Sequence, residues 1–259
     1  MTESKRIVID AGHGGMDPGA VFGTRQEKDD NLRLALAVGQ NLCQAGQQVG
    51  YTRVMDVDQT AFEKAEMANS ADADYFVSLH RNIMPIPGTA SGVESLVYEN
   101  SGTAGIMAAN INSELGNAGF SNLGIVERPG VIVLHQTKMP AVLVEVGFLD
   151  NDRDNQLFEM NFQQIAEAIA RGILMTVEQE EVPPDYYQIQ VGAFRNQDYA
   201  EQLLRQLRGQ GFPAFIVVED GLFKVRVGAF LNIDNAARME QVLRNMGYTT
   251  YMVKAPAVY

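Results

Sequence analysis

Three residues that could bind a metal ion each follow a run of apolar residues typical of a β-strand. His13 comes after residues 6–12 (RIVIDAG), His80 after residues 75–79 (YFVSL) and Glu145 after residues 141–144 (AVLV). In an open, mostly parallel α/β sheet, ligands bind beyond the carboxyl ends of the strands, so groups that are distant in sequence meet there. Two imidazoles and a carboxylate at such an edge predict a hydrolytic metal centre.

Glu145 stands in surroundings that a carboxylate rarely occupies without a partner. It lies between Ala-Val-Leu-Val and Val-Gly-Phe-Leu, so the sequence predicts that most of its contact with water is lost. Such a charge is costly to bury unless it is paired or bound to a metal. Loss of water also raises the pKa of a carboxyl group, which suits a general base or acid near neutral pH.

A catalytic zinc ion commonly has three protein ligands, of which two histidines and a glutamate are one known set. His13 lies in Gly-His-Gly-Gly at 12–15, where the glycines leave its imidazole open to an ion and a substrate. Glu27, in the loop expected before the next helix, is one source for the second carboxylate, although an exposed loop glutamate is usually only solvated. His135 follows another strand-like run, and spacing alone leaves it as a ligand, a substrate contact or neither.

The residues around these candidates alternate between strand and helix patterns up to about residue 176. A helix is expected from Asp29 or Asp30 to Gly46, where apolar residues recur at helical spacing. Further strands are expected at 49–53, 92–99, 131–134 and 141–146, further helices at 60–70 and 105–115, and a last amphipathic helix that carries residues 162–173. This alternation predicts an α/β domain whose twisted, mostly parallel or mixed sheet is covered by helices on both faces.

An acidic stretch with a proline pair, EQEEVPPD at 178–185, predicts a linker between a first domain at 1–177 and a second domain at 186–259. The second domain contains an internal repeat with an offset of 36 residues, since YQIQVGAF at 187–194 returns as FKVRVGAF at 223–230. Each half has a strand, a helix and a second strand. The repeat therefore predicts a small α+β domain of βαββαβ order, in which two helices back one sheet.

Composition limits the partners and the compartment. The chain has 259 residues and a formal net charge of −12, which argues against nucleic acid and membrane as partners because phosphate groups need clustered Lys and Arg. It has no run of 18 apolar residues, so no membrane-spanning helix is expected. The N-terminus shows no signal-peptide pattern, so we expect a chain that starts in the cytoplasm or one whose leader was removed. The single cysteine, Cys43, is expected in a helical core and forms no disulfide.

Together and in this order, the motifs of the first domain resemble those of the zinc-dependent N-acetylmuramoyl-L-alanine amidases of the type 3 family. The matching segments are IDAGHGG at 9–15, DPGA at 17–20, QEK at 26–28, SLH at 78–80 and MPAVLVEVGFLDN at 139–151. The paired segments of the second domain resemble the SPOR domain, a peptidoglycan-binding module. The layout is similar to that of sporulation-associated amidases that lack a signal peptide and act in mother-cell lysis.

This resemblance implies that His13, Glu27 and His80 hold one Zn²⁺ ion and that Glu145 is the catalytic acid and base. The bond cut would be the amide between the lactyl group of N-acetylmuramic acid and the L-alanine of the stem peptide in peptidoglycan. The enzyme would act on the cell wall, either from the mother-cell cytoplasm after lysis or by release without a leader.

Two positions depart from the family pattern. Arg81 and Asn82 follow His80, where the family often has small residues, and Arg81 is therefore a candidate to contact substrate or to close the site. His135 lies where arginine is common, so it stays outside the expected ligand set. Arg128 is a second candidate for substrate binding.

The second domain is expected to bind glycan through polar residues that alternate with apolar ones along its strands. Gln188, Gln190, Lys224 and Arg226 have this spacing, and Gln190 and Arg226 are the candidates for contact. Neutral N-acetyl sugars suit an acidic protein better than polyanions, and the resemblance suggests a preference for glycan that has lost its peptides. A fold of this kind carries no function by itself, so a protein-interaction or dimerisation module is the alternative.

Two other classes of protein compete with the amidase interpretation. A nucleotide-binding oxidoreductase also has a glycine-rich turn after its first strand, but the spacing here is not GxGxxG, and Arg53 rather than an acid ends the second strand. A non-catalytic peptidoglycan-binding protein with the same fold is the other alternative. The presence of all four residues His13, Glu27, His80 and Glu145 argues against it.

Overall fold

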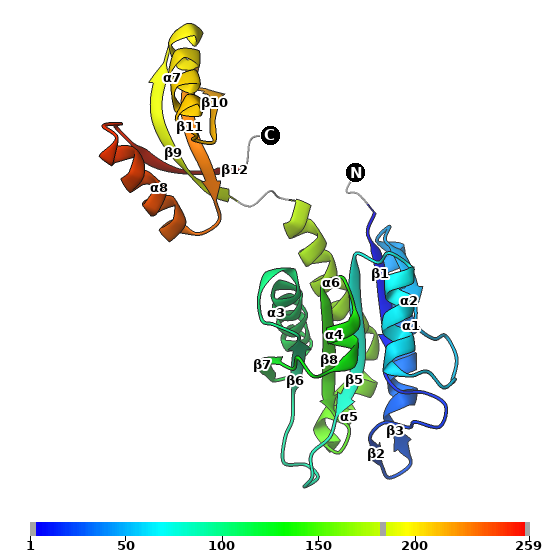
Figure 1. Cartoon of the computed structure of the whole chain (residues 1–259). Coiled ribbons are helices and arrows are strands. Elements are labelled where there is room, and N and C mark those ends of the chain that lie inside the picture. Colours follow the sequence, from blue (N-terminus) through cyan, green and yellow to red (C-terminus); the bar gives the residue numbers. More distant parts are fainter. Residues whose placement is uncertain (1–3, 182–184, 257–259) are drawn as a thin grey trace. The chain divides into compact units, whose positions relative to one another are not determined.

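The computed structural model describes residues 4–181 and 185–256 (Figure 1). The chain forms two compact units, Met1–Glu181 and Val182–Tyr259. Each unit has a hydrophobic core of its own. Within the two described ranges, no helix combines the length and the apolar character needed to traverse a bilayer.

A mixed sheet forms the centre of the first unit, as the sequence predicts, and it has six strands. Its strands are β1 (Arg6–Ala11), β4 (Gln48–Tyr51), β5 (Tyr75–Asn82), β6 (Val93–Val97), β7 (Asn122–Glu127) and β8 (Ala141–Phe148), in the spatial order β4-β1-β5-β8-β6-β7. The first four in this order are parallel, β6 is antiparallel to β8, and β7 is parallel to β6. Two short strands, β2 (Val21–Phe22) and β3 (Arg25–Gln26), pair outside this sheet. The strands β1, β5 and β8 therefore all end at the same edge.

Helices cover both faces of the sheet (Figure 1). The long helices α1 (Glu27–Gln44), α3 (Gly102–Asn117) and α6 (Phe162–Glu181) pack on one face, and α2 (Ala61–Ser70) and the short α4 (Ile132–Gln136) pack on the other. A further helix, α5 (Asp152–Met160), contacts β8 and α6. Helices α3 and α6 approach each other closely at Gly172, where an added Cβ would lie 2.6 Å from the Cα of Ile111.

Alternation along the central strands separates packing residues from polar ones. One side of β1, β5 and β8 contributes apolar residues to the major core under the three long helices: Ile7, Ile9, Val77, Leu79, Val142 and Val144. The other side begins with apolar residues that pack under α2 and α4: Val8, Phe76 and Leu143. Further along the same side, the strands carry the polar residues Asp10, Ser78, His80 and Glu145. The candidate residues thus share one face because side chains in a strand repeat with a period of two.

Some local predictions differ from the structure. Residues 132–134 belong to the start of α4 rather than to a strand, and Val131 precedes this helix as its N-cap residue. A short apolar run has no period that separates a strand from a buried helical turn. The helix expected from Asp29 or Asp30 begins at Glu27, so Glu27 is a helical residue and not a loop residue. Cys43 is exposed rather than buried. The elements β7 and α5 were not expected at all.

The second unit has the predicted βαββαβ order. Its elements are β9 (Asp185–Phe194), α7 (Gln197–Gly209), β10 (Ala214–Glu219), β11 (Leu222–Phe230), α8 (Ile233–Asn245) and β12 (Tyr251–Pro256). The strands form one antiparallel sheet in the order β10-β11-β9-β12. The repeat extends to the helix caps, since the side chains of Asn196 and Asn232 each accept a hydrogen bond from the backbone N–H two residues further on.

The segment between the units is shorter than the predicted linker at 178–185. Helix α6 continues to Glu181 and β9 begins at Asp185, so residues 178–181 are helical. Glutamate and glutamine are good helix formers, which explains why the acidic half of the stretch continues α6. Residues 182–184 lie outside the described residues.

Candidate active site

The structure brings three of the predicted residues together at the carboxyl edge of the sheet. His13 lies in the turn after β1, Glu27 is the first residue of α1, and His80 lies near the end of β5. One ligand atom from each of them lies within 4.8 Å of the other two. His13 Nε2 is 3.2 Å from Glu27 Oε2, and His80 Nδ1 is 2.9 Å from Glu27 Oε1. Two nitrogen atoms and one oxygen at such spacing suit a single metal ion.

One tautomer of His80, with its hydrogen on Nε2, leaves Nδ1 free to bind a metal and satisfies the other partners of the ring. Burial acts to raise the pKa of Asp10, but Lys64 and two hydroxyl groups outweigh burial and hold that pKa below its usual value. Asp10 is therefore an ionised acceptor, and Ser78 donates its hydroxyl hydrogen to it over 2.6 Å. Ser78 Oγ in turn accepts the hydrogen of His80 Nε2 over 3.1 Å. In this tautomer the lone pair of His80 Nδ1 faces Glu27, 2.9 Å from Oε1, and in the metal-free chain a proton on Nδ1 makes the same contact a hydrogen bond.

His13 has the same arrangement with its two nitrogens exchanged. Its Nδ1 lies 2.7 Å from Asp17 Oδ2 and donates a hydrogen bond to that carboxylate. The lone pair of Nε2 then faces Glu27 from the other side. Supporting carboxylates of this kind fix the tautomer and orientation of metal-binding histidines.

A cation is needed where two imidazole lone pairs and a carboxylate converge. Without a metal ion, a proton meets this need, because Glu27 and Asp17 outweigh the effect of burial and raise the pKa of His13 to about 9. Burial also acts to raise the pKa of Glu27, yet His13 and His80 hold it well below its usual value. Glu27 Oε2 accepts a further hydrogen bond from the backbone of Ala20. The carboxylate is therefore ionised, as a metal ligand must be.

Two glycines allow these side chains to approach one another. An added Cβ at Gly12 would lie 2.3 Å from Cε1 of His80, and one at Gly19 would lie 2.5 Å from Cδ2 of His13. Gly19 also has a φ of 65°, a backbone conformation that strains other residues. The glycines around His13 are thus required by packing between the ligands as well as by access to the imidazole.

Buried cations hold the backbone of the His13 turn. His13 itself has a φ of 61°, which is uncommon for a residue other than glycine. Lys64 Nζ donates to the carbonyl groups of Ala11 and His13 over 2.6 and 3.1 Å. Arg53 donates to the carbonyl groups of Ala11 and Gly12 over 3.1 and 3.0 Å. These contacts fix the strained turn and with it the position of the imidazole.

The residues that support the ligands were not among those predicted from the sequence. Asp10 and Ser78 carried a usable signal, because a polar residue inside an apolar strand, on the same face as the candidate ligands, needs a partner there. No sequence pattern points to Lys64, since only the fold brings α2 to the His13 turn.

Glu145 lies beside the cluster, on β8. Its backbone is in register with His80 on β5 and with Glu94 on β6. Its Oε2 atom is inaccessible and has no hydrogen-bond partner among the described residues. Burial, assisted by the charges of Glu27 and Glu94, raises the pKa of Glu145 to about 7, although His80 and His13 act in the opposite direction. A carboxyl group with a pKa near neutrality can take a proton and return it.

A pocket of about 330 Å³ adjoins the two histidines. Its polar lining includes Asp10, Lys64, His13 and His80. Its apolar lining includes residues at and just before the start of α4 and one residue of β8: Val131, Ile132, Val133 and Leu143. Apolar walls exclude water and strengthen the electrostatic interactions beside them. The arrangement suits hydrolysis of a bond held between the metal-binding residues and a proton-transferring carboxyl group.

Arg81 does not have the role that the sequence suggested. Its side chain is buried, with Nη1 2.6 Å from Asp30 Oδ2, Nη2 2.8 Å from Asn155 Oδ1, and its guanidinium group over the ring of Phe158. Burial lowers the pKa of Arg81 to about 10. Because strand residues alternate, Arg81 points away from the face that carries His80. The prediction of substrate contact is wrong, and Arg81 instead ties β5 to α1 and α5.

Arg128 and His135 lie outside the cluster. Arg128 follows β7, is exposed and donates to the carbonyl group of Glu127 over 3.4 Å. It lies two residues before Gly130, which lines the pocket, so its contact with substrate stays a prediction. His135 is part of α4, and its ring lies 5.8 Å from the ring of Tyr98.

In the second unit, the residues expected to face glycan are not all accessible. Arg226 is 3% exposed, and its guanidinium nitrogens lie 3.2 Å from Gln188 Oε1 and 2.5 Å from Glu219 Oε2. Gln188 is fully buried, and Lys224 pairs with Glu219. The expectation that Gln188 and Arg226 lie on an open face is therefore wrong. Gln190 is half-buried and lies opposite Arg226 in the sheet, so its contact with glycan stays a prediction.

Comparison with known proteins adds independent information on both units. Residues 7–175 match the family described as N-acetylmuramoyl-L-alanine amidase, and residues 183–254 match the SPOR domain. The chain is 33% identical over 221 residues to the N-acetylmuramoyl-L-alanine amidase CwlM of Bacillus licheniformis. The matched region covers 83% of this chain and 85% of that protein. It is 32% identical over 222 residues to a sporulation-specific N-acetylmuramoyl-L-alanine amidase of Bacillus subtilis, with the same coverage.

Solved structures show the same similarity. An N-acetylmuramoyl-L-alanine amidase from Clostridium difficile 630 superposes with a TM-score of 0.65 at 32% identity, over 69% of this chain and 100% of that chain. The catalytic domain of CwlV, an N-acetylmuramoyl-L-alanine amidase from Bacillus (Paenibacillus) polymyxa var. colistinus, gives a TM-score of 0.63 at 33% identity, over 67% of this chain and 98% of that chain.

Proposed function

This chain belongs to the N-acetylmuramoyl-L-alanine amidase family, and we propose on this basis that it is a zinc enzyme. It is a peptidoglycan amidase of that type, and it carries a SPOR domain. In the proposed reaction, water cleaves the amide between the lactyl group of N-acetylmuramic acid and the L-alanine of the stem peptide. His13, Glu27 and His80 would hold one Zn²⁺ ion, and Glu145 would transfer the protons.

The convergence of His13 Nε2 and His80 Nδ1 on the carboxylate of Glu27 is the observation that carries the metal proposal. Each histidine gives its remaining N–H to a supporting oxygen, that of Ser78 for His80 and that of Asp17 for His13. This pattern orients both rings for a metal ion. Two histidines and a glutamate are also a donor set of known catalytic zinc sites. The residues present therefore fit Zn²⁺.

The mechanism needs one group that activates the substrate and one that moves protons. A bound Zn²⁺ ion would polarise the scissile carbonyl group and lower the pKa of water. Glu145 takes a proton from the attacking water, whose oxygen forms the new bond to the carbonyl carbon. Glu145 then delivers this proton to the nitrogen of L-alanine as the carbon–nitrogen bond breaks. The products are a lactyl carboxylate and a stem peptide with a free amine.

Digestion of purified sacculi by the full chain tests which bond is cut. We expect mass spectrometry to find new L-alanine amino termini and no new reducing sugars. New reducing ends would indicate a glycosidase and would contradict the proposal. A protein that contains zinc but releases no amino termini would favour the alternative of a non-catalytic peptidoglycan-binding protein.

The proposal extends to the ligand of the second unit. The expected target is glycan that has lost its stem peptides, which is the product of the first unit. Gln190 is the candidate contact, because it is half-buried and lies on β9, between β11 and β12 in the sheet. Neutral sugars are also compatible with a chain whose net charge is −12.

Removal of residues 182–259 is expected to weaken binding to sacculi by on the order of tenfold or more, because the second point of attachment is lost. Cleavage of small soluble fragments should change little, since the first unit has a separate core. Pelleting with sacculi measures the first effect, and release of L-alanine amino termini from soluble fragments measures the second. Pelleting that is unchanged by the truncation would contradict the role of the second unit.

A further inference from the structure

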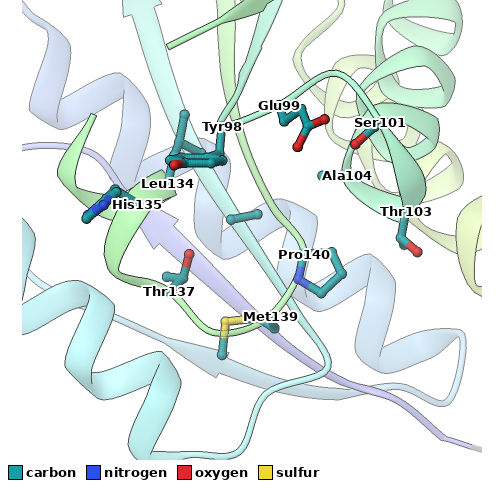
Figure 2. A pocket seen from close by; sticks show the side chains of 11 residues that line it. Tyr98, Glu99, Ser101, Thr103, Ala104, Leu134, His135, Thr137, Met139 and Pro140 are labelled. Carbon is teal, nitrogen blue, oxygen red and sulfur yellow. The ribbon is translucent and has the colours of Figure 1, made fainter. Parts of the chain in front are cut away.

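A second pocket lies on the first unit, apart from the metal-binding cluster (Figure 2). Its volume is about 440 Å³, and its lining comes from the segment after β6, the start of α3, the end of α4 and the start of β8. Ala141 lines this pocket, Leu143 lines the pocket beside the histidines, and both share one face of β8 with Glu145. The strand from Ala141 to Glu145 spans about 13 Å. The second pocket therefore lies at the start of β8, about that far along the strand from Glu145, and α4 and the start of α3 both contribute to its lining.

Aromatic and apolar side chains form much of the lining. The side chain of Tyr98 is 47% exposed, and its ring lies 5.8 Å from that of His135 at an angle of 42°. In Figure 2, Met139 and Pro140 lie across the pocket from the Tyr98 ring. A tyrosine ring of this kind offers a large apolar surface with a polar hydroxyl at its edge. The C–H face of a sugar ring is a ligand surface that packs on such an aromatic ring.

Polar groups at the same pocket have hydrogen-bonding capacity that the chain does not use. Within the described residues, the Tyr98 hydroxyl, the Glu99 carboxylate and the Ser101 hydroxyl make no hydrogen bond or ion pair. The lining contains neither lysine nor arginine, so nothing in it favours an anion. A carboxylate acceptor and two hydroxyl groups match a neutral ligand that is itself rich in hydroxyl groups.

We propose that this pocket binds an N-acetylated hexosamine ring of a glycan strand, at a distance from the bond that is cut. Tyr98 and His135 pack against the face of the sugar ring, and Glu99 and Ser101 bond to its hydroxyl groups. The choice of ligand rests on the proposed function, which makes peptidoglycan the substrate, but binding at the pocket needs neither a metal ion nor turnover. A ring held here fixes the glycan relative to the catalytic residues.

Methyl NMR on the full chain tests this proposal at the pocket itself. Met139 lines the pocket, and its ¹³C-labelled methyl signal can be assigned with the variant Met139→Leu. We expect titration with chitotriose, a neutral trimer of N-acetylglucosamine without peptide, to move this signal to saturation. Tyr98→Ala should weaken the affinity measured at Met139 by about tenfold, as expected for the loss of one aromatic contact. Glu99→Gln should also weaken it.

Tyr199→Ala is the matched control, because Tyr199 is an exposed tyrosine on α7 of the second unit. This variant should leave the sugar affinity measured at Met139 unchanged. Sugar that binds to the second unit is detected separately, because it moves the methyl signal of Met252 on β12. The proposal is overturned if the trisaccharide does not move the Met139 signal, or if Tyr98→Ala and Glu99→Gln leave the affinity unchanged. It is also overturned if a lysine-containing stem peptide moves that signal and the sugar does not.

The outcome for the pocket and the outcome for the proposed function can be told apart. A Met139 response to sugar without release of L-alanine termini from sacculi would retain the pocket and remove the amidase reaction. Release of those termini without a Met139 response would support the amidase reaction and overturn the proposal for the pocket.

Discussion

Replacement of Glu145 by glutamine is expected to lower kcat by a factor of about 10²–10⁴, the usual contribution of a general acid or base. Glutamine keeps the shape of the side chain but cannot take a proton from water. The affinity for Zn²⁺ should change little, because Glu145 is not one of the clustered ligand residues. Turnover of a soluble N-acetylmuramoyl peptide and the metal content by elemental analysis measure the two effects.

Glu94 provides the matched control for this substitution. It is the neighbour of Glu145 on β6, and its carboxylate accepts a hydrogen bond from Asn82 over 2.7 Å. Glu94→Gln should therefore keep kcat within about tenfold of the wild type. Full activity of Glu145→Gln, or an equal loss in both variants, would show that Glu145 has no special role in proton transfer.

Glu145→Gln should also stabilise the metal-free chain at high pH. Burial raises the pKa of Glu145 from 4.5 to about 7, so the folded chain holds this proton more tightly than the unfolded chain does. The corresponding stabilisation is complete below pH 4.5 and is lost as the pH rises through about 7. Glutamine has no proton to lose. We therefore expect urea unfolding with a chelator present to give Glu145→Gln a larger free energy of unfolding than the wild type at pH 8. At pH 4 the variant should have no comparable advantage. An equal difference at the two pH values would contradict the raised pKa of Glu145.

Replacement of His13 by alanine is expected to remove both the metal ion and the activity. Loss of a residue that only supports a ligand costs about 10–100-fold in metal affinity, and loss of the ligand itself should cost more. Asp17→Asn is the graded control, because Asp17 supports His13 without joining the cluster. We expect Asp17→Asn to lose metal on dialysis and to regain activity with excess Zn²⁺, whereas His13→Ala regains none. A His13→Ala protein that keeps one Zn²⁺ ion and its turnover would refute the ligand assignment.

Metal binding to the wild-type chain should release a proton from His13. Because Glu27 and Asp17 raise the pKa of His13 to about 9, the metal-free site is protonated at neutral pH. The apparent affinity for Zn²⁺ should therefore increase with pH up to about 9 and level off above it. Calorimetric titrations at pH 7 in two buffers with different ionisation enthalpies count the protons released. No release at that pH would contradict the proposed state of His13.

The meeting of His13, His80 and Glu145 could be predicted from sequence because it depends on local patterns. Apolar runs mark the strands, and a period of two decides which residues share a face. Glu27 could not be placed in the same way. Its position depends on the start of α1, where the sequence suggested a later helix start, and on contacts with His80, which is 53 residues away.

Arg81 and Arg226 show where polar residues in strands mislead. Both were expected to meet ligands, and both are buried beside carboxylates from other elements, Asp30 and Glu219. A sequence shows that a strand carries a polar residue, but it does not show whether a partner lies on the same side. Residues 131–134 raise a similar difficulty, since only packing against β8 and α2 decides that an apolar run forms a helical turn.

The 36-residue repeat makes Gln190 and Arg226 equivalent positions, and the two residues are also direct neighbours across β9 and β11. A pseudo-twofold axis must therefore pass between these strands, and it exchanges the two halves of the sheet. A polysaccharide has chemically different ends, but a backbone with this symmetry treats both directions alike. Any preference of the second unit for one polarity of the strand must come from differences between accessible side chains at equivalent positions of the two halves.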